Sequence, residues 1–526
     1  MLNGGFAPLE GFLEQGDYED VLDTMHLRNK ALWPIPINLD VTQEFADKIS
    51  INKDIVLKDQ EGVPLAVLHV SSIWEADKTK EALAVFGTED KAHPGVDFLF
   101  YHKKPIYIGG KLSGMQLPTH YNFPHIRKTP EELKKFFKEK GWKKILGFQT
   151  RNPMHKAHVA MTIYGAQKVD AKLLLHPVVG ITKLGDIDYT TRVRCYEKLM
   201  KHYPKDSADL SLLPLAMRMA GPREALWHAL IRKNYGCTHF LIGRDHAGCT
   251  DEAGKPYYGP YDAHELAKKY QSELGIEIVF IHEMVHLKDK KIYVPVTDVK
   301  EDQKNQIEQV SGSELRRMLK EGLEVPEWFS YPEVIHELRE TNKPKYEQGF
   351  TLFFTGLSGA GKSTIANGLM VRLHELTSRT VTLLDGDRVR HELAQELGFS
   401  KEHRDMNILR IGYVASEITK HRGIAICAPI APYSDIRHLV REKVTQYGGF
   451  IEIYVSTSLE VCESRDRKGL YAKARAGKLK GFTGIDDPYE VPIKPEVTLD
   501  TAKMSPLESI NTIIEALYKQ GYLKKE

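Results

Sequence analysis

A glycine-rich turn in the second half of the chain constrains the fold more than any other feature. Residues 356–364 read Gly-Leu-Ser-Gly-Ala-Gly-Lys-Ser-Thr, between an apolar run, 350–354, and an amphipathic run, 365–376. A buried strand, a glycine loop and a helix in this order are typical of a P-loop, whose backbone N–H groups surround phosphate oxygens at the positive end of the helix. We therefore predict an α/β domain that binds ATP. A glycine-rich turn that binds nothing is the disfavoured alternative.

The lysine and the hydroxyl groups of this loop have separate expected roles. Lys362 is expected to reach the β- and γ-phosphates, and Ser363 is expected to hold Mg²⁺. The residues predicted to bind ATP here are Gly356, Ser358, Gly359, Ala360, Gly361, Lys362, Ser363 and Thr364. The loop begins at residue 356 of 526, so most of the chain precedes it. A chain of this length is expected to contain about three or four domains.

The overall composition disfavours several classes of function. The formal net charge is only +2, which argues against a broad surface for nucleic acid. No apolar run approaches the ~20 residues of a membrane span, and the first five residues lack the order of a secretory signal. The five cysteines include no C-x-x-C pair and no zinc-like cluster, so we expect a cytoplasmic protein without structural zinc.

The pattern of apolar runs divides the chain into three predicted domains. Residues 1–125 carry short β-rich runs between Gly and Pro turns, while 126–340 alternate strand-like with helical runs. Such alternation is typical of a parallel sheet that binds ligands at the carboxyl ends of its strands. A polar stretch, 340–349, is the predicted linker to the P-loop domain, 348–526. The strand-like runs before the P-loop domain are 55–57, 65–70, 105–109, 144–149, 173–179, 240–243 and 276–282.

Two polar segments follow strand-like runs in the second predicted domain. Residues 149–158, Gln-Thr-Arg-Asn-Pro-Met-His-Lys-Ala-His, open a helix on which His155 and His158 share one face. This places anion-binding groups where a helix favours negative charge. Two histidines at this spacing also fit a metal site or a structural role. Residues 243–248, Gly-Arg-Asp-His-Ala-Gly, repeat the arrangement, and they fit a loop with a surface Arg–Asp pair equally well.

Together these segments resemble ATP sulfurylases over nearly all of residues 1–340. The resemblance implies a PUA-like N-terminal domain and a Rossmann-like nucleotidylyltransferase domain. The implied reaction joins ATP and sulfate into adenosine 5′-phosphosulfate (APS) and releases pyrophosphate. Family members usually have more residues ahead of the Asn-Gly-Gly-Phe segment, so part of the first domain is expected to be missing or reassigned. Further matching stretches are 2–12 (LNGGFAPLEGF), 176–180 (HPVVG), 214–225 (PLAMRMAGPREA) and 311–317 (SGSELRR).

The same resemblance assigns roles to individual residues. Gln149 and Arg151 would bind sulfate with the backbone N–H of Ala247, Val285 would line the adenine pocket, and the two histidines would face the triphosphate. Sulfate is already ionised, so the reaction needs no general base but does need groups that stabilise the developing pentacoordinate phosphorus. The predicted catalytic residues are Thr150, Arg151 and Asn152. Those expected to hold ATP are Gln149, Thr150, Arg151, Asn152, His155, His158, Gly243, Arg244, Asp245 and His246. Arg218 and Arg223 either contribute or form surface or structural ion pairs.

The P-loop domain carries a second set of candidate residues. Asp385 and Asp387 follow the strand-like run 381–384, where a carboxylate can meet Mg²⁺ or accept a hydroxyl proton; a solvated turn is the alternative. This region resembles APS kinases across 350–526, through 385–390 (DGDRVR), 397–400 (LGFS), 468–477 (KGLYAKARAG) and 480–486 (KGFTGID). The implied reaction moves the γ-phosphoryl group of ATP to the 3′-hydroxyl of APS.

By matching position, Asp387 would act on the hydroxyl proton, Ser363 and Asp385 would bind the metal, and Phe399 and Phe482 would sandwich the adenine or else serve as core aromatics. The residues implied to bind APS are Asp387, Arg390, Phe399, Arg404, Asn407, Ile430, Ala431, Lys468, Gly481 and Phe482.

Two positions depart from the kinase pattern. The family often has Ile-Ser-Pro where this chain has Ile430-Ala431-Pro432, so a phosphoserine cannot form and we predict direct in-line transfer. His403 stands where an aspartate usually precedes Arg404, which removes a carboxylate partner and is expected to loosen that arginine.

The main interpretation is a bifunctional enzyme that activates sulfate in two steps. The alternative is a sulfurylase whose second domain is only an allosteric nucleotide-binding module. The expected partners are ATP, sulfate, APS and, since relatives are dimers or hexamers, further copies of the chain; nucleic acid and membranes are not expected.

Overall fold

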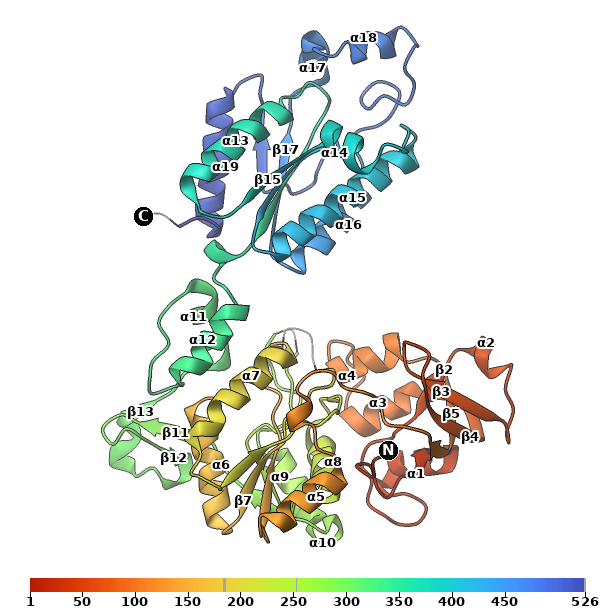
Figure 1. The fold of residues 1–526 in the computed structure, drawn as a ribbon, viewed down its shortest axis with the longest axis vertical. Helices are drawn as coiled ribbons and strands as arrows, with labels where there is room; N and C mark the ends of the chain where they lie inside the picture. The colour runs from red at the N-terminus through yellow and green to blue at the C-terminus, as the bar shows by residue number, and fades with distance from the viewer. Residues whose placement is uncertain (183–185, 252, 525–526) are drawn as a thin grey trace. The chain divides into compact units, whose positions relative to one another are not determined.

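The structure is a computed structural model that describes residues 1–182, 186–251 and 253–524 (Figure 1). The chain divides into two compact units. The first comprises residues 1–312 and 325–341, and the second comprises 313–324 and 342–526. Across the described residues, no helix has the length and apolar content that crossing a membrane requires.

The first unit begins with a β-rich region, as its short apolar runs predicted. Its strands form an antiparallel sheet in the order β1-β5-β4-β3, with β2 paired to β5. Helices α1 and α3 pack against each other beside this sheet. The strands are β1 (Gly11–Phe12), β2 (Leu39–Val41), β3 (Asp54–Lys58), β4 (Pro64–Glu75) and β5 (Ile106–Gly114). The helices are α1 (Gln15–Thr24), α2 (Gln43–Ala46), α3 (Lys78–Phe86) and α4 (Pro94–Asp97), followed by a π-helical turn (Phe98–His102).

The second part of this unit is the predicted parallel sheet. Its strand order is β10-β9-β6-β7-β8, and every neighbouring pair is parallel. Most residues of the central strands are buried, because helices cover both faces of such a sheet. The strands are β6 (Ile145–Phe148), β7 (Lys172–Leu175), β8 (Ala208–Leu210), β9 (His239–Ile242) and β10 (Glu277–Phe280). The helices are α5 (Pro130–Glu139), α6 (Lys156–Lys168), α7 (Tyr189–Leu199), α8 (Gly221–Asn234), α9 (Asp262–Lys269) and α10 (Gln271–Leu274).

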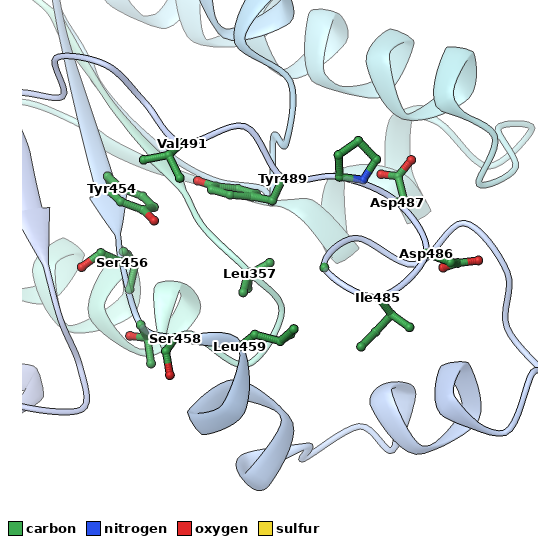
Figure 2. A pocket seen from close by; sticks show the side chains of 14 residues that line it. Leu357, Tyr454, Ser456, Ser458, Leu459, Ile485, Asp486, Asp487, Tyr489 and Val491 are labelled. Carbon is green, nitrogen blue, oxygen red and sulfur yellow. The ribbon is translucent and has the colours of Figure 1, made fainter.

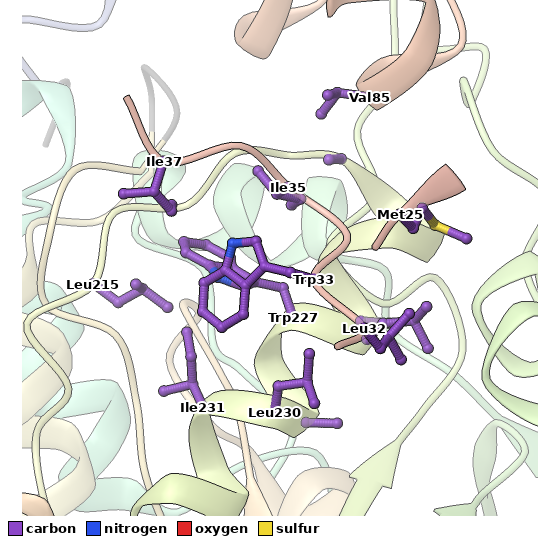
Figure 3. Close-up of a cluster of buried hydrophobic side chains, with 14 of the residues drawn as sticks. Met25, Leu32, Trp33, Ile35, Ile37, Val85, Leu215, Trp227, Leu230 and Ile231 are labelled. Carbon is purple, nitrogen blue, oxygen red and sulfur yellow. The ribbon is translucent and has the colours of Figure 1, made fainter. Parts of the chain in front are cut away.

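Helix α8 joins the β-rich region and the parallel sheet into one core. Trp33, with no exposed surface, lies in the same apolar cluster as Trp227 of α8. Figure 3 shows side chains from the N-terminal region gathered against α8. The ring of Phe6 bridges the two indoles, at 6.1 Å from Trp33 and 5.7 Å from Trp227. Because ten of the fourteen residues of α8 are buried, this helix has no solvated face.

A small antiparallel sheet and further helices follow the parallel sheet. The small sheet has the order β12-β11-β13. Its strands are β11 (Met284–Leu287), β12 (Ile292–Pro295) and β13 (Ile307–Glu308), and the helices after it are α11 (Gly312–Glu321) and α12 (Pro332–Thr341). Residues 313–324 group with the second unit, although the sequence placed them in the domain 126–340. A side chain at Gly322 would collide with Tyr346, which shows how closely this segment packs within the second unit.

The second unit is a five-stranded parallel sheet with helices on both faces (Figure 1). Its strand order is β15-β16-β14-β17-β18, which places the P-loop strand at the centre. Alternate residues of that strand enter different cores. Phe350, Leu352 and Phe354 lie in the core with α13 and α19, whereas Phe353 lies in the core with α15 and α16. This confirms the α/β fold predicted from the glycine loop and its flanking runs.

The elements of the second unit agree with the predicted positions where the sequence had specified them. The strands are β14 (Phe350–Thr355), β15 (Val381–Asp385), β16 (Ile424–Ala428), β17 (Gly449–Val455) and β18 (Val497–Leu499). The helices are α13 (Lys362–Leu376), α14 (Gly386–Leu393), α15 (Lys401–Lys420), α16 (Ser434–Thr445), α17 (Leu459–Arg465), α18 (Leu470–Arg475) and α19 (Pro506–Gln520). The predicted linker holds a 3₁₀ turn, Lys345–Glu347.

Candidate functional sites

The two polar segments of the first unit follow neighbouring strands. Residues 149–152 continue from β6, residues 243–247 continue from β9, and these strands pair in parallel through Gly147 and Phe240. Because the carboxyl ends of parallel strands share one edge of a sheet, both segments lie at the same edge. Helix α6 begins there at Lys156, so its N-terminal N–H groups add to the positive potential of this edge.

The loop after β6 is held by buried groups of helix α7. Arg192, 2% exposed, donates to the backbone oxygen of Arg151 at 2.8 Å. The hydroxyl of Tyr196 donates to the backbone oxygen of Asn152 at 2.8 Å. The Thr150 hydroxyl accepts the Asn152 N–H at 3.2 Å, which closes a tight turn. The predicted catalytic residues therefore lie on a rigid turn, as a preorganised site requires.

Arg151, the predicted sulfate ligand, is paired with an acidic residue. Its Nη1 lies 2.5 Å from Oδ2 of Asp186, and both side chains are mostly buried. Its Nη2 lies 3.5 Å from the backbone oxygen of Gly248, in the loop after β9. The guanidinium thus reaches between the two loops. An anion that binds Arg151 must share it with Asp186, a competitor that the sequence pattern did not indicate.

The two histidines at the start of α6 are neutral at physiological pH. Burial lowers the pKa of His155 to about 3 and that of His158 to about 4. The backbone N–H of His155 donates to Nδ1 of His158 at 3.2 Å, so neutral His158 carries its proton on Nε2. Nδ1 of His155 lies 2.9 Å from the Ser330 hydroxyl. These side chains can donate hydrogen bonds to phosphate oxygens but cannot act as cations there.

The loop after β9 has an unusual backbone. Asp245 and Ala247 both adopt left-handed conformations, with φ of 53° and 55°. Non-glycine residues in this region cost conformational energy and concentrate at functional sites. Arg244 is half exposed and pairs with Glu283 at 3.0 Å, so its carboxylate partner comes from outside this segment. Val285, the expected adenine neighbour, is only 1% exposed.

His246, from the same loop, ends a buried polar chain. Its Nε2 lies 3.0 Å from Nδ1 of His228, and Nε2 of His228 lies 3.3 Å from Oε1 of Glu224. Glu224 also accepts the backbone N–H groups of Arg218 and Ala220, at 2.8 and 2.9 Å. Burial lowers the pKa of His246 well below its ordinary value, and it is therefore neutral. Helix α8 thus orients His246, one of the residues predicted to bind ATP, through His228 and Glu224.

The structure separates the two arginines whose role the sequence left open. Arg223 donates to the backbone oxygens of Val21, Leu22 and Pro34, which gives it a structural role. The side chain of Arg218 is half-buried, and its backbone is fixed by Glu224. Arg218 therefore remains a candidate residue for the site of the first unit.

In the second unit, most of the predicted residues surround one cavity. Its volume is about 860 Å³. The predicted residues that line it are Ser358, Gly359, Gly361, Lys362, Ser363, Thr364, Asp385, Arg390, Phe399, Arg404, Asn407, Ile430, Ala431, Lys468, Gly481 and Phe482. Gly356 and Ala360 belong to the glycine loop but do not line the cavity, and Ala360 is fully buried. The side chain of Asp387 lies outside the described part of the structure.

The phosphate-binding loop has the backbone that its glycines predict. Gly356 has φ of 146°, and a Cβ there would lie 2.6 Å from the backbone oxygen of Val455. Lys362 donates to the backbone oxygens of Gly356 and Leu357, both at 2.8 Å. The Ser363 hydroxyl donates to Oδ2 of Asp385 at 2.8 Å. A hydroxyl and a carboxylate this close in a phosphate cavity are oxygen ligands of the kind that Mg²⁺ prefers, so the residues fit the expected metal.

The expectation that Arg404 is loosened was wrong. Its Nη1 donates to Asp487 at 2.9 Å and to the Thr483 hydroxyl at 3.0 Å, and its Nη2 donates to Tyr433 at 2.9 Å. Asp487 therefore supplies the carboxylate partner that residue 403 does not. His403 instead accepts the backbone N–H of Gly398 at 2.9 Å, next to Phe399.

The two predicted adenine neighbours differ in their surroundings. Phe399 is 68% exposed, and the guanidinium of Arg390 lies 4.5 Å from its ring. Phe482 makes an edge contact with Tyr471 at 5.0 Å, and Asp486 accepts its backbone N–H. Both rings line the cavity, and an exposed aromatic ring can stack on a base. Phe399 is therefore available for stacking.

Figure 2 shows another hollow of this unit, of about 630 Å³. Tyr454, Tyr489 and Val491 line it, together with serine hydroxyls and the acidic pair Asp486 and Asp487. Its lining includes no lysine, arginine or histidine. Such a surface suits a phosphate group less well than the larger cavity does, because that cavity is lined by lysine and arginine side chains.

The fold and these sites define a protein in which a PUA-like region and a nucleotidyltransferase sheet precede a P-loop domain. Three family models match: "PUA-like domain" at residues 1–117, "ATP-sulfurylase" at 124–341 and "Adenylylsulphate kinase" at 348–500. A sulfate adenylyltransferase of Phaeosphaeria nodorum is 49% identical over 527 residues, 99% of this chain and 92% of that protein. One from Chaetomium globosum is 49% identical over 529 residues, 100% and 92% of the two chains.

A solved structure, described as "Hexameric APS kinase from Thiobacillus denitrificans", aligns with a TM-score of 0.81 and 34% identity, over 99% of this chain and 91% of that one. The chain belongs to the ATP-sulfurylase family, in a form with a C-terminal domain that is similar to APS kinases.

Proposed function

We propose that the first unit is a sulfate adenylyltransferase. A sulfate oxygen attacks the α-phosphorus of ATP, the bond to the β-phosphate bridging oxygen breaks, and APS and pyrophosphate leave. The arrangement of residues 149–152 and 243–247 at one sheet edge carries this proposal, because two loops rich in hydrogen-bond donors follow neighbouring parallel strands, as a site for an anion would require. The names of the fungal relatives support it.

The residues of this edge have the properties that the reaction needs. Sulfate has no proton to lose at neutral pH, so neither histidine has to act as a base. Arg151 bridges the two loops and can hold the attacking anion against the nucleotide. The neutral His158 can donate from Nε2 to the triphosphate. Fixed donors of this kind lower the barrier for bringing two anions together.

Arg151→Ala tests this proposal. The variant should lose about 10²–10³-fold in sulfate-dependent pyrophosphate release, the typical cost of removing one transition-state donor. Pyrophosphate is measured by a coupled assay on the full chain, and nucleotide binding to the second unit serves as the internal control for folding. If the variant releases pyrophosphate at the wild-type rate, Arg151 does not belong to the site.

For the second unit we consider two functions. The names of the fungal relatives mention only sulfate adenylyltransferase, although these proteins align over 92% of their length. This supports an allosteric nucleotide-binding module better than a second catalytic step. In that case ATP or APS would occupy the cavity and change the rate of the first unit without phosphoryl transfer.

The second candidate is APS kinase, favoured by the cavity itself. Lys362, Ser363 and Asp385 have the groups that would hold Mg²⁺ and the terminal phosphates, and Arg404 lines the same cavity. Ser363 and Asp385 would hold Mg²⁺, which would supply positive charge to offset that of the phosphates. The 3′-hydroxyl of APS would attack the γ-phosphorus, its proton would pass to the carboxylate that the family pattern places at residue 387, and ADP would leave. The name of the whole-chain structural neighbour also supports this candidate.

Lys362→Ala distinguishes the two functions. The full chain is given APS and Mg-ATP, and ADP is measured. A kinase predicts ADP from the wild type and about a 10²-fold loss in the variant, with pyrophosphate release retained. If the wild type forms no ADP, yet bound nucleotide changes its pyrophosphate release, the allosteric module is the correct interpretation.

We also propose that the chain assembles with copies of itself. The hexamer named for the structural neighbour, which covers 99% of this chain, supports this. Light scattering on the purified chain would measure its mass in solution.

A further inference from the structure

Helix α8 carries a line of buried polar residues that the reaction itself does not use. Glu224, His228 and Arg232 are four residues apart, so they lie on one face of the helix. All three have no exposed surface. Glu224 and His228 lead to His246, as described above. Arg232 contacts Gln149, in the loop after β6. This contact determines which hydrogen-bonding groups the predicted sulfate site, or oxyanion site, can offer to an anion.

Arg232 fixes the side-chain amide of Gln149. Its Nη2 lies 2.7 Å from Oε1 of Gln149 and 2.7 Å from the backbone oxygen of His176. A guanidinium has five N–H donors and no acceptor. The amide atom that faces it must therefore be the oxygen. The Nε2 group of Gln149 is turned the other way, where it lies 3.3 Å from the sulfur of Met217, a weak acceptor.

The buried charge of Arg232 makes this orientation hard to reverse. Burial lowers the pKa of its guanidinium to about 10, which still leaves it charged at neutral pH. Among the described residues, no carboxylate forms an ion pair with it. If the Gln149 amide flipped, its NH₂ group would face the guanidinium and a buried cation would lose an acceptor, which is costly.

A locked Gln149 can offer the anion only N–H donors. Arg151, the neighbouring sulfate ligand, is likewise a donor only. Sulfate at neutral pH carries no proton, so each of its oxygens can accept. Hydrogen phosphate has almost the same shape and charge but carries one P–O–H group, which needs an acceptor. A flipped Gln149 would supply that acceptor through Oε1.

We propose that Arg232 is a specificity-determining residue that locks the Gln149 amide and so makes the oxyanion site select fully deprotonated oxyanions over hydrogen phosphate. The proposal rests on the function proposed for the first unit, in which Gln149 contacts sulfate. Arg232 does not touch the anion and acts by positioning Gln149. The site is expected to bind sulfate-sized anions that carry no O–H group in preference to those that carry one.

The test measures equilibrium binding of oxyanions to the full chain in the presence of an ATP analogue with a methylene group between its α- and β-phosphates. The ratio of the Kd for hydrogen phosphate to the Kd for sulfate should fall about tenfold in Arg232→Gln, because a glutamine at 232 can donate or accept and allows the Gln149 amide to turn. Arg232→Lys keeps a donor-only group and should retain the wild-type ratio. Selenate, which has no proton at this pH, should keep its ratio to sulfate in every variant.

Arg223→Gln is the matched control. It removes a half-buried arginine from the same helix, one that donates to backbone oxygens far along the chain, at residues 21, 22 and 34. A merely structural effect of losing a buried guanidinium would shift the anion ratio in both variants. The proposal is overturned if Arg232→Gln is folded and keeps the wild-type ratio, or if Arg223→Gln changes the ratio equally.

A measurement on the wild type removes any dependence on folding of the variant. Monofluorophosphate has the charge of hydrogen phosphate but carries fluorine in place of the hydroxyl. A site with donors only should bind it about tenfold more tightly than hydrogen phosphate; equal affinities overturn the proposal. Binding also separates this inference from the proposed function. A wild type that binds sulfate but forms no pyrophosphate contradicts the function alone, whereas one that binds no oxyanion contradicts both.

Discussion

Acid should destabilise the first unit through the buried histidine at the start of α6. His155 is 7% exposed and has a pKa of about 3, against about 6.5 in an unfolded chain. Because its folded pKa is lowered, the unfolded state binds more protons as pH falls below 6.5, and stability is lost in that direction. Between pH 7 and pH 5 the unfolded side chain becomes almost fully protonated while the folded one does not. At 1.36 kcal/mol per pH unit, this costs about 2 kcal/mol.

Tryptophan fluorescence during urea unfolding measures this loss of stability for the first unit of the structure. All five tryptophans belong to the first unit: Trp33, Trp74, Trp142, Trp227 and Trp328. In His155→Gln the residue cannot titrate but can still bond to Ser330. The free energy of unfolding of the variant should therefore fall by about 2 kcal/mol less than that of the wild type between pH 7 and pH 5.

His125→Gln, which replaces an exposed histidine of the same unit, is the matched control and should behave as the wild type. If His155→Gln loses as much free energy as the wild type over this range, the burial argument is refuted.

Two further predictions concern groups that hold the predicted ligands. Asp186→Asn should lower the KM for sulfate about fivefold, because a neutral amide competes less for Arg151 than a carboxylate does; a higher KM in the pyrophosphate assay would mean that Asp186 serves to orient the arginine. Asp487→Ala should weaken APS binding about tenfold without changing the affinity for ATP, since Arg404 loses its charged partner. Calorimetry with each ligand checks this, and equal losses for both ligands would contradict it.

Local sequence predicted the elements that bring ligands together. The apolar runs before residues 149, 243 and 356 form β6, β9 and β14, and each is followed by the expected loop. This succeeded because a buried parallel strand is a continuous apolar run, and because its loop must end at the ligand-binding edge of the sheet. Most of the predicted residues of the second unit consequently line one cavity.

The polar line of α8 could not be predicted in the same way. Charged or polar residues four apart, at 224, 228 and 232, are typical of a solvated helix face. Here that face is buried against the loops that carry Gln149 and His246. Burial of a helix face depends on distant residues, and the helix sequence alone contains no sign of them.

The partner of Arg404 was missed for a related reason. The family pattern places a carboxylate beside it, at residue 403, but the partner is Asp487, 83 residues further along the chain. A parallel sheet connects distant segments at one edge, so the neighbours of a site residue are set by strand order. Here the loop after Gly481 returns to α15, and no local pattern shows that return.

The shared core around α8 has a consequence for anyone who wishes to recombine parts of this chain with those of other proteins. Cutting near residue 120 would expose Trp227 and deprive Arg223 of its three acceptors. A chimaera should therefore inherit residues 1–312 and 325–341 from a single parent, and an exchanged nucleotide domain should bring residues 313–324 with it, because that segment groups with the second unit.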